Sequence, residues 1–132
     1  EKGLLGHSDA DVALHALMDA MLGALGEGDI GRHFSDSDEQ YRGIASTELL
    51  RRVVELTRNK GYRVGNCDVT IVAQAPKLAP YIEEMRANVA RVLGVDVSRV
   101  NIKATTTERL GFEGEGLGIS AQAVAVMRSE AK

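Results

Sequence analysis

The feature that most constrains the fold is a strand, helix, strand succession in the second half of the chain. Residues 67–75 alternate apolar and polar side chains, which is typical of a strand buried on one side. A helical pattern begins after a turn bracketed by Pro76 and Pro80, and it stops at Gly94; residues 100–105 then form a second strand-like segment. The apolar face of the first strand consists of Cys67, Val69, Ile71 and Ala73. Strands that alternate with helices predict a sheet with helices packed on it.

Two helices are predicted in the first half of the chain. The first is expected to begin at Ser8, an N-cap residue with Asp11 as its capping-box-like partner, and to run to about Leu25. A glycine-rich loop over residues 26–31 is expected to follow. The second helix is expected to be capped by Ser46, and the pair Lys60-Gly61 is its predicted stop.

A third strand is predicted over residues 119–127, where small side chains recur. Ala121, Ala123 and Ala125 share one face, so we expect close packing there, with another subunit as a candidate partner. The 132 residues suit one domain, residues 1–132. The pattern indicates an α/β or α+β fold, a ferredoxin-like layered sheet with helices on one face.

Composition excludes several classes of function. The net charge is -3 and aromatic residues make up 4%, so neither a general nucleic-acid affinity nor a base-stacking surface is expected. No apolar run approaches the roughly 20 residues of a membrane span, so no membrane partner is expected. Cys67 is the one cysteine, which rules out an internal disulfide and fits a reducing compartment. Its place among apolar residues favours a core role over a catalytic one.

The strongest chemical pattern is the run at residues 104–108. Thr105, Thr106, Thr107 and Glu108 follow a predicted strand, and hydroxyls with a carboxylate can bind phosphate oxygens and a divalent cation together. Threonine runs also favour strands through their β-branched side chains, so a purely structural role remains open.

A second candidate group lies on the first helix. Asp11, His15 and Asp19 follow a four-residue spacing and share one face, where an imidazole between carboxylates suits a transition metal. A solvated polar stripe is the commoner explanation of such spacing. His7 and Ser8 are expected at the unpaired N–H groups of the first turn, which suit a phosphate, although simple capping is the commoner explanation.

Two weaker signals complete the set. Asp29 stands in the turn at residues 28–31, where a carboxylate suits a sugar hydroxyl. Lys77 follows the strand at residues 67–75, at a strand end where substrates often bind in α/β folds, although an ordinary surface lysine is the commoner case.

Taken together, five motifs occur in one order, at residues 6–15, 28–31, 34–36, 68–77 and 104–108. In these motifs the sequence resembles the 2-C-methyl-D-erythritol 2,4-cyclodiphosphate synthase family of the non-mevalonate isoprenoid pathway. The resemblance covers nearly the whole chain. It implies conversion of 4-diphosphocytidyl-2-C-methyl-D-erythritol 2-phosphate to the cyclic diphosphate and CMP.

The resemblance also implies cofactors, assembly and location. The family is a homotrimer with active sites between adjacent subunits, and each site holds one zinc ion and one magnesium or manganese ion. The expected location is the cytoplasm, or the plastid stroma in a plant or alga. Two other functions remain open, namely a catalytically silent trimer that binds cytidine nucleotides and a metal-dependent phosphohydrolase.

Residue roles follow from the resemblance, position by position. His15 matches the helical zinc ligand, and Glu108 matches the carboxylate on the magnesium or manganese ion. The catalytic set implied is His7, Ser8, Thr106 and Glu108. The implied substrate-binding set is His7, Ser8, Asp29, Ile30, Gly31, Asp36, Ala73, Lys77, Leu78, Ala79, Ala104, Thr105, Thr106 and Phe112.

The chain departs from the family pattern at two places. The family carries an Asp-x-His pair on an N-terminal strand that supplies the other two zinc ligands, and no such pair precedes His15. We therefore expect the N-terminal strand region to be missing from this sequence. Glu115 and Leu117 stand where many members have Arg and Glu around a central glycine, so the trimer-axis anion site of the family is not expected here.

Overall fold

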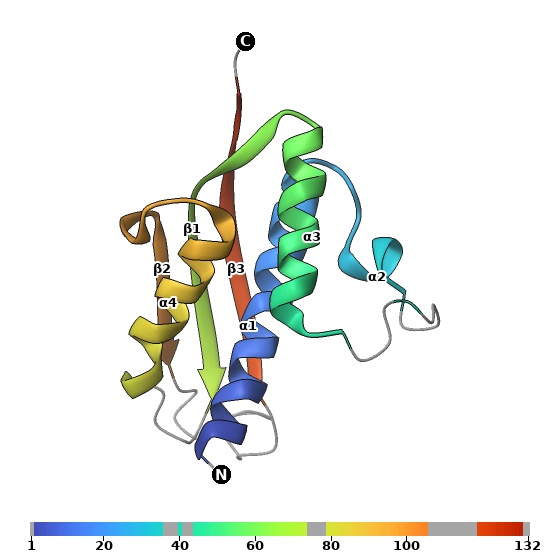
Figure 1. The fold of residues 1–132 in the computed structure, drawn as a ribbon. Helices are drawn as coiled ribbons and strands as arrows, with labels where there is room; N and C mark the ends of the chain where they lie inside the picture. Colours follow the sequence, from blue (N-terminus) through green and yellow to red (C-terminus); the bar gives the residue numbers. More distant parts are fainter. Residues whose placement is uncertain (1, 36–39, 41–43, 74–78, 106–118, 131–132) are drawn as a thin grey trace.

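The computed structural model describes residues 2–35, 40, 44–73, 79–105 and 119–130, with side chains from Ala10 onward. Its helices and strands alternate in the way the sequence predicts (Figure 1). In chain order they are α1 (Lys2–Ala24), α2 (Ile30–His33), α3 (Ser46–Asn59), β1 (Tyr62–Ala73), α4 (Ala79–Leu93), the 3₁₀ turn η2 (Val97–Arg99), β2 (Val100–Thr105) and β3 (Ile119–Ser129).

The strands form one sheet in the order β2-β1-β3. β1 and β2 run parallel, with Cys67 opposite Val100, and α4 is the crossover between them. β3 runs antiparallel to β1, from Ile119 opposite Ala73 to Ser129 opposite Tyr62. The mixed α+β class predicted from the sequence is therefore confirmed.

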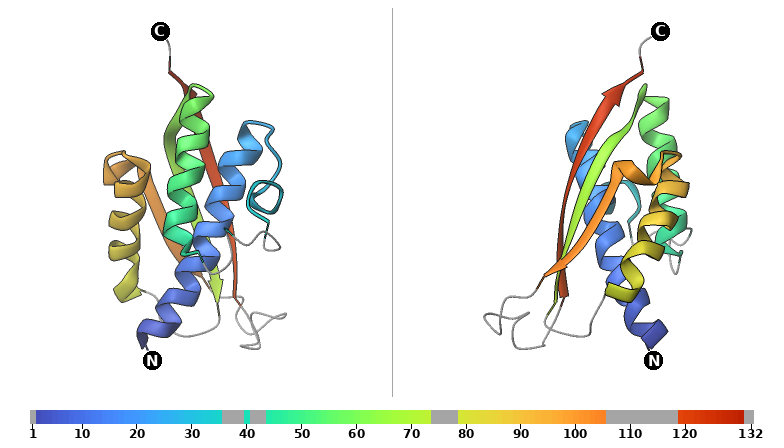
Figure 2. Two further views of the ribbon diagram at one scale, coloured as in Figure 1. Left: turned by 45° about the vertical axis from the view of Figure 1, so that its right-hand side comes forward. Right: turned by 90° about the vertical axis from the view of Figure 1, so that its left-hand side faces the viewer.

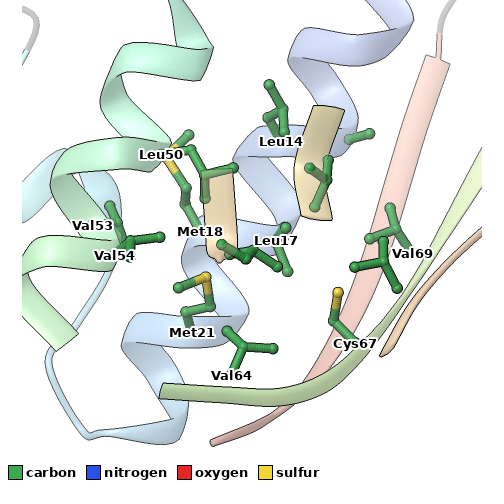
Figure 3. Close-up of a cluster of buried hydrophobic side chains, with 14 of the residues drawn as sticks. Leu14, Leu17, Met18, Met21, Leu50, Val53, Val54, Val64, Cys67 and Val69 are labelled. Carbon is green, nitrogen blue, oxygen red and sulfur yellow. The ribbon is translucent and has the colours of Figure 1, made fainter. Parts of the chain in front are cut away.

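Helices pack on one face of this sheet, as Figure 2 shows for α3 and α4. α1 lies against β3 and β1, α3 against α1 and β1, and α4 against β2. Their apolar side chains meet those of β1 in the core, where Leu17 of α1 points toward Cys67 and Met18 lies beside Leu50 of α3 (Figure 3). The predicted alternation of β1 is confirmed, because the core side of this strand includes Cys67, Val69, Ile71 and Ala73.

The other face of the sheet is open along β3. Val124 is 68% exposed and Val126 is 51% exposed, whereas the alternating residues Ala123 and Ala125 pack against the core. We call the surface around Val124 and Val126 the open sheet face. Large exposed apolar side chains on a regular sheet indicate an interaction surface.

The prediction of close packing at the small residues of β3 is right, but the proposed partner is wrong. Ala123 and Ala125 lie opposite Val69 and Cys67, so they share the core face of β1. They pack beneath α1 of the same chain and not against another subunit. Register decides this, because a strand has two faces and pairing selects which one is covered.

The predicted start of the first helix is wrong. α1 begins at Lys2, so Ser8 lies inside the helix and neither caps it nor forms a capping box with Asp11. A cap contributes only about 1 kcal/mol, and residues 2–7 contain no proline that would stop the helix from extending. The predicted end near Leu25 is close to the observed end at Ala24.

Three further boundaries differ from prediction. Ala45, and not Ser46, occupies the N-cap of α3, with no side-chain cap bond. The short helix α2 replaces part of the predicted loop at residues 26–31. β1 begins at Tyr62, five residues early, because a bulge between Val64 and Asn66 interrupts the alternation that would reveal the strand. α4 ends before Gly94, as predicted, and Gly94 has a φ of 73°.

Candidate active site

The polar stripe of Asp11, His15 and Asp19 on α1 is exposed. Exposure fits both a metal-binding role and simple solvation. Asp11, His15 and Asp19 all lie on the solvent side of the helix, with Leu14, Leu17 and Met18 on the buried side. The carboxylate of Asp19 has a structural partner, because its Oδ1 accepts a hydrogen bond of 2.9 Å from the backbone N–H of Ile30. Asp19 therefore ties the start of α2 to α1, one helical turn beyond His15.

That contact was missed from the sequence. The four-residue spacing assigns Asp19 to a predicted metal-binding stripe, whereas its observed partner lies 11 residues away in a segment predicted to be a loop. No spacing pattern reports a bond between a helix side chain and a loop N–H. An aspartate one turn after His15 on the same face, followed by the Gly-Asp-Ile-Gly turn, is the signal that could have suggested it.

Asp29 has a defined geometry at the start of α2. It occupies the N-cap with extended backbone, and its Oδ1 accepts a hydrogen bond of 2.9 Å from the N–H of Arg32. Gly28 precedes it with a φ of 81°, a conformation that other residues rarely adopt. Asp29 is exposed, and within the described residues its second oxygen has no partner, so it can accept a bond from a ligand hydroxyl.

His33 is the third histidine of the chain and is already used locally. Its Nε2 lies 2.6 Å from the carbonyl oxygen of Glu27, to which it donates a hydrogen bond. It therefore helps to close the loop between α1 and α2 and is not a candidate for the site.

A second part of the candidate site gathers at the carboxyl ends of the parallel strands. Ala73 ends β1, Thr105 ends β2 and Ala79 begins α4, all at the lower end of the molecule in Figure 1. Ala104 lies opposite Ile71, and both Ala104 and Thr105 are exposed. The carboxyl edge of parallel strands is where ligands bind in α/β sheets, because backbone groups and a helix start meet there.

Several predicted site residues cannot be placed. Asp36, Lys77, Leu78, Thr106, Glu108 and Phe112 lie outside the described residues. His7 and Ser8 are described by their backbone, which is helical. Because α1 begins at Lys2, their N–H groups are not in the first turn, so their expected position at a helix start is wrong, and their role in binding phosphate stays a prediction.

The two parts of the candidate site lie on different sides of the chain. α2 packs against α1, whereas β2 is the edge strand covered by α4. Figure 1 and the left view of Figure 2 both show α2 and β2 on opposite sides, with β1 and α3 between them. The structure of one chain therefore does not bring Asp29 next to Thr105.

The described residues do not form a complete metal site by themselves. Among residues 2–35, 40, 44–73, 79–105 and 119–130, no three His, Cys, Asp or Glu side chains are grouped so that they could hold a metal ion. His15 offers an exposed imidazole, which fits the role of one ligand and no more.

Cys67 has no part in the chemistry. It is 2% exposed in the core, and burial raises the pKa of its thiol to about 11. A thiol with that pKa stays protonated near neutral pH, so the prediction that Cys67 is a core residue is confirmed.

Of the helices in the described ranges, none has the length and apolar character to cross a membrane.

Comparison with known proteins identifies a family. The sequence profile of the YgbB family matches residues 1–128. A Syntrophotalea carbinolica protein named 2-C-methyl-D-erythritol 2,4-cyclodiphosphate synthase is 64% identical over 129 residues, which are 98% of this chain and 79% of that protein.

Solved structures agree with the sequence comparison. The bifunctional IspDF of Campylobacter jejuni matches with a TM-score of 0.85 and 39% identity, over 89% of this chain and 32% of that one. The Plasmodium falciparum IspF in complex with CDP matches with a TM-score of 0.79 and 32% identity, over 91% of this chain and 72% of that one.

Proposed function

Because this chain belongs to the YgbB family, we propose that it catalyses the reaction for which its relatives are named. In that reaction 4-diphosphocytidyl-2-C-methyl-D-erythritol 2-phosphate is converted to 2-C-methyl-D-erythritol 2,4-cyclodiphosphate and CMP. The observation that carries the proposal is the high identity to the Syntrophotalea synthase along nearly the whole chain. The enzyme is then a lyase of isoprenoid precursor biosynthesis.

The reaction needs little acid–base chemistry from the protein. The 2-phosphate is already an anion; it attacks the β-phosphorus, the new P–O bond forms, and the bond to CMP breaks. The main barrier is to bring two anionic groups together and to stabilise the charge that spreads over the phosphoryl oxygens. Bound divalent cations supply electrostatic stabilisation of that charge.

We assign the binding roles by the position of each residue. Asp29, Ile30 and Gly31 would hold the erythritol hydroxyls, since Asp29 has an exposed carboxylate oxygen on a turn anchored to α1. Ala73, Ala79, Ala104 and Thr105 would bind the cytidine and diphosphate at the strand ends. His7, Ser8, Thr106 and Glu108 keep the catalytic roles implied by the resemblance, and Asp36, Lys77, Leu78 and Phe112 keep their substrate contacts.

Two metals belong to this proposal. His15 would be one zinc ligand, because its imidazole is exposed beside the turn that carries Asp29. Glu108 would hold magnesium or manganese beside the threonine hydroxyls. The reducing compartment that suits the single buried thiol of Cys67 leads us to assign the enzyme to the cytoplasm, or to the plastid stroma in a plant or alga.

We further propose a homotrimer with active sites between adjacent subunits. Two observations support it. The open sheet face carries the exposed valines Val124 and Val126, which a partner subunit would cover. The two parts of the candidate site lie on opposite sides of one chain, so that one subunit could complete the site of the next.

The test is to incubate the full-length protein with the diphosphocytidyl substrate and magnesium, and to follow phosphorus by ³¹P NMR. We expect the cyclic diphosphate and CMP in equal amounts. Release of inorganic phosphate without a cyclic product would instead identify a phosphohydrolase. Binding of CMP with no turnover would identify a silent nucleotide-binding protein.

A further inference from the structure

A polar pocket lies at the opposite end of the sheet from the strand ends of the candidate active site. It encloses about 470 Å³ where β1 begins and β3 ends, at the upper end of Figure 1. Its lining includes Arg63 of β1, Arg128 of β3 and Arg99 of η2, and the segment 94–96 forms another part of the wall. Three arginines from three elements therefore line one pocket, which the proposed reaction does not use.

Two of these arginines are paired across the sheet. Arg63 and Arg128 are direct partners in the antiparallel register of β1 and β3. Like charges placed directly opposite each other destabilise a sheet. The polar contacts that these arginines already make are weak. The guanidinium of Arg63 lies 3.7 Å from the Glu130 carboxylate and donates a 3.4 Å hydrogen bond to the Gly94 carbonyl. Arg128 has no polar partner among the described residues.

The backbone at the Gly65 bulge contacts two of the three arginine side chains, Arg99 and Arg128. Arg99 Nη1 donates a hydrogen bond of 2.9 Å to the carbonyl oxygen of Gly65. The methylenes of Arg128 lie over the same residue, so close that a Cβ on Gly65 would be 2.8 Å from its Cδ. The backbone at Gly65 thus positions both side chains, and a site held in this way loses less entropy when it binds a ligand.

Charge in the pocket is unbalanced. Its acidic residues are Asp96 and Glu130, against three arginines, in a chain whose net charge is -3. One oxygen of Asp96 accepts the N–H of Ser98 at 2.9 Å; bonds from Ser98, and to a lesser extent the charge of Arg99, lower the pKa of Asp96. The carboxylate of Asp96 is thus occupied in capping η2, and the arginines retain donors for another anion.

We propose that this pocket binds a small molecule through a phosphate or diphosphate group, with Arg63, Arg99 and Arg128 as its ligands. Guanidinium groups offer paired N–H donors that match phosphate oxygens, and a polyanion between Arg63 and Arg128 removes their repulsion. The site is separate from the proposed catalytic site and does not depend on the function assigned to it.

The probe is inorganic diphosphate, titrated by calorimetry into the full-length protein without divalent cations and at constant ionic strength. A site at the strand ends would not depend on Arg128, so the Arg128 variants below assign the measured binding to this pocket. We expect one saturable site per chain. Arg128→Gln should weaken diphosphate binding about tenfold or more, the loss of a charge-assisted bond.

The matched control is Arg91→Gln, which also removes one positive charge, but at a site on α4 outside the pocket. There Arg91 donates a hydrogen bond to the side chain of Asn88. It should leave diphosphate affinity unchanged. Arg128→Lys keeps the charge and the stem but lacks the paired donors, so its affinity should fall between the wild type and Arg128→Gln. Circular dichroism reports folding, and Arg99→Gln replaces Arg128→Gln if the latter does not fold.

Three results would overturn the proposal. The wild-type protein could show no saturable diphosphate binding. Arg128→Gln and Arg91→Gln could lose affinity equally, which would reflect net charge alone. Finally, the wild type could ignore diphosphate while Arg128→Gln lowers the oligomer mass, which would show that a carboxylate of a second copy fills the pocket.

Discussion

Single residues on the open sheet face join β1 to β2 near the strand ends of the candidate active site. Asp68 accepts hydrogen bonds from Asn101 at 2.9 Å and from Lys103 at 2.5 Å. The bond to Lys103, followed by that to Asn101, lowers the pKa of the Asp68 carboxyl. Asn101 and Lys103 lie three residues and one residue before Ala104, so these contacts help to hold the end of β2 against β1.

This pairing makes stability depend on pH. The folded-state pKa of Asp68 lies below its unfolded value, so its stabilisation is complete above the unfolded pKa, about 4, and is lost as pH falls through the folded pKa. Asp68→Asn should cost at most about 1 kcal/mol at neutral pH, because the pair is half exposed. Urea unfolding should show the wild type and the variant converging at about pH 2. A difference that is constant with pH would mean that the charge of Asp68 is not responsible.

Glu108 tests the proposed second metal. Glu108→Gln keeps the shape of the side chain and removes the anionic ligand. We expect turnover to fall roughly 10²-fold, as for the loss of an electrostatic contact to the transition state. More magnesium or manganese should recover part of it by mass action. Normal turnover at low metal would exclude Glu108 as a metal ligand and leave Asp29 or Asp36 as the next candidate.

Asp19 tests the anchoring of the α2 turn. Asp19→Ala removes the bond to the Ile30 N–H and should loosen the turn that carries Asp29. We expect KM for the full substrate to rise about tenfold, the value of one charge-assisted bond, and CDP affinity to stay constant. Asp19→Asn keeps an acceptor oxygen and should retain most of the function. Equal loss of CDP affinity would show a general structural defect instead of a positioning role.

At the scale of elements, the junction after α4 depends on a glycine and an arginine from α3. Gly94 has a φ of 73°, and Arg58 Nη2 donates a 3.1 Å bond to the adjacent carbonyl of Leu93. A Cβ on Gly94 would meet Arg58 Nη2 at 2.5 Å. Arg58 thus links the end of α4 to α3.

Gly94→Ala should therefore destabilise the fold. The left-handed backbone costs about 1 kcal/mol with a Cβ, and displacement of Arg58 costs about 1 kcal/mol more. We expect Tm to fall by roughly 4–8 °C in thermal unfolding followed by circular dichroism. The control is Gly23→Ala in α1, where a Cβ meets nothing within 4 Å and helix propensity rises. If both variants behaved alike, the φ of Gly94 would not matter.

At the scale of the whole molecule, the open sheet face decides assembly in our proposal. The apolar side chains of Val124 and Val126 are more than half exposed to solvent in the single chain. Both lie on the face of the sheet that no helix of the described residues covers. Burial of such side chains between subunits is worth roughly 1 kcal/mol or more each.

Val124→Lys should break the assembly. A buried lysine without a partner is costly, so light scattering after gel filtration should show the mass of a monomer in place of a trimer. Turnover should fall with it, because the sites lie between subunits in the proposal. The control Val97→Lys changes another exposed valine, on η2 and 41% exposed, and should leave the mass unchanged. A Val124→Lys trimer with normal activity would contradict the assigned interface.

The sequence by itself determined the local elements and the family. The bounds of β2, the core side of β1 and the end of α4 at Gly94 were all predictable, because side-chain alternation and glycine stops act within a few residues. The five collinear motifs pointed to the family that comparison confirms. Local signals misled at the caps Ser8 and Ser46, which are worth about 1 kcal/mol, and at the start of β1, where a bulge interrupts the alternation.

Tertiary structure alone decided what those elements do together. The order β2-β1-β3, the placement of Ala125 under α1, the bond from Ile30 to Asp19 and the meeting of Arg63 with Arg128 all join positions far apart in the chain. A periodic pattern states that a residue has a buried side, but not which element covers it. That choice is made by strand register and by the packing of whole faces, which depend on the complete set of long-range contacts.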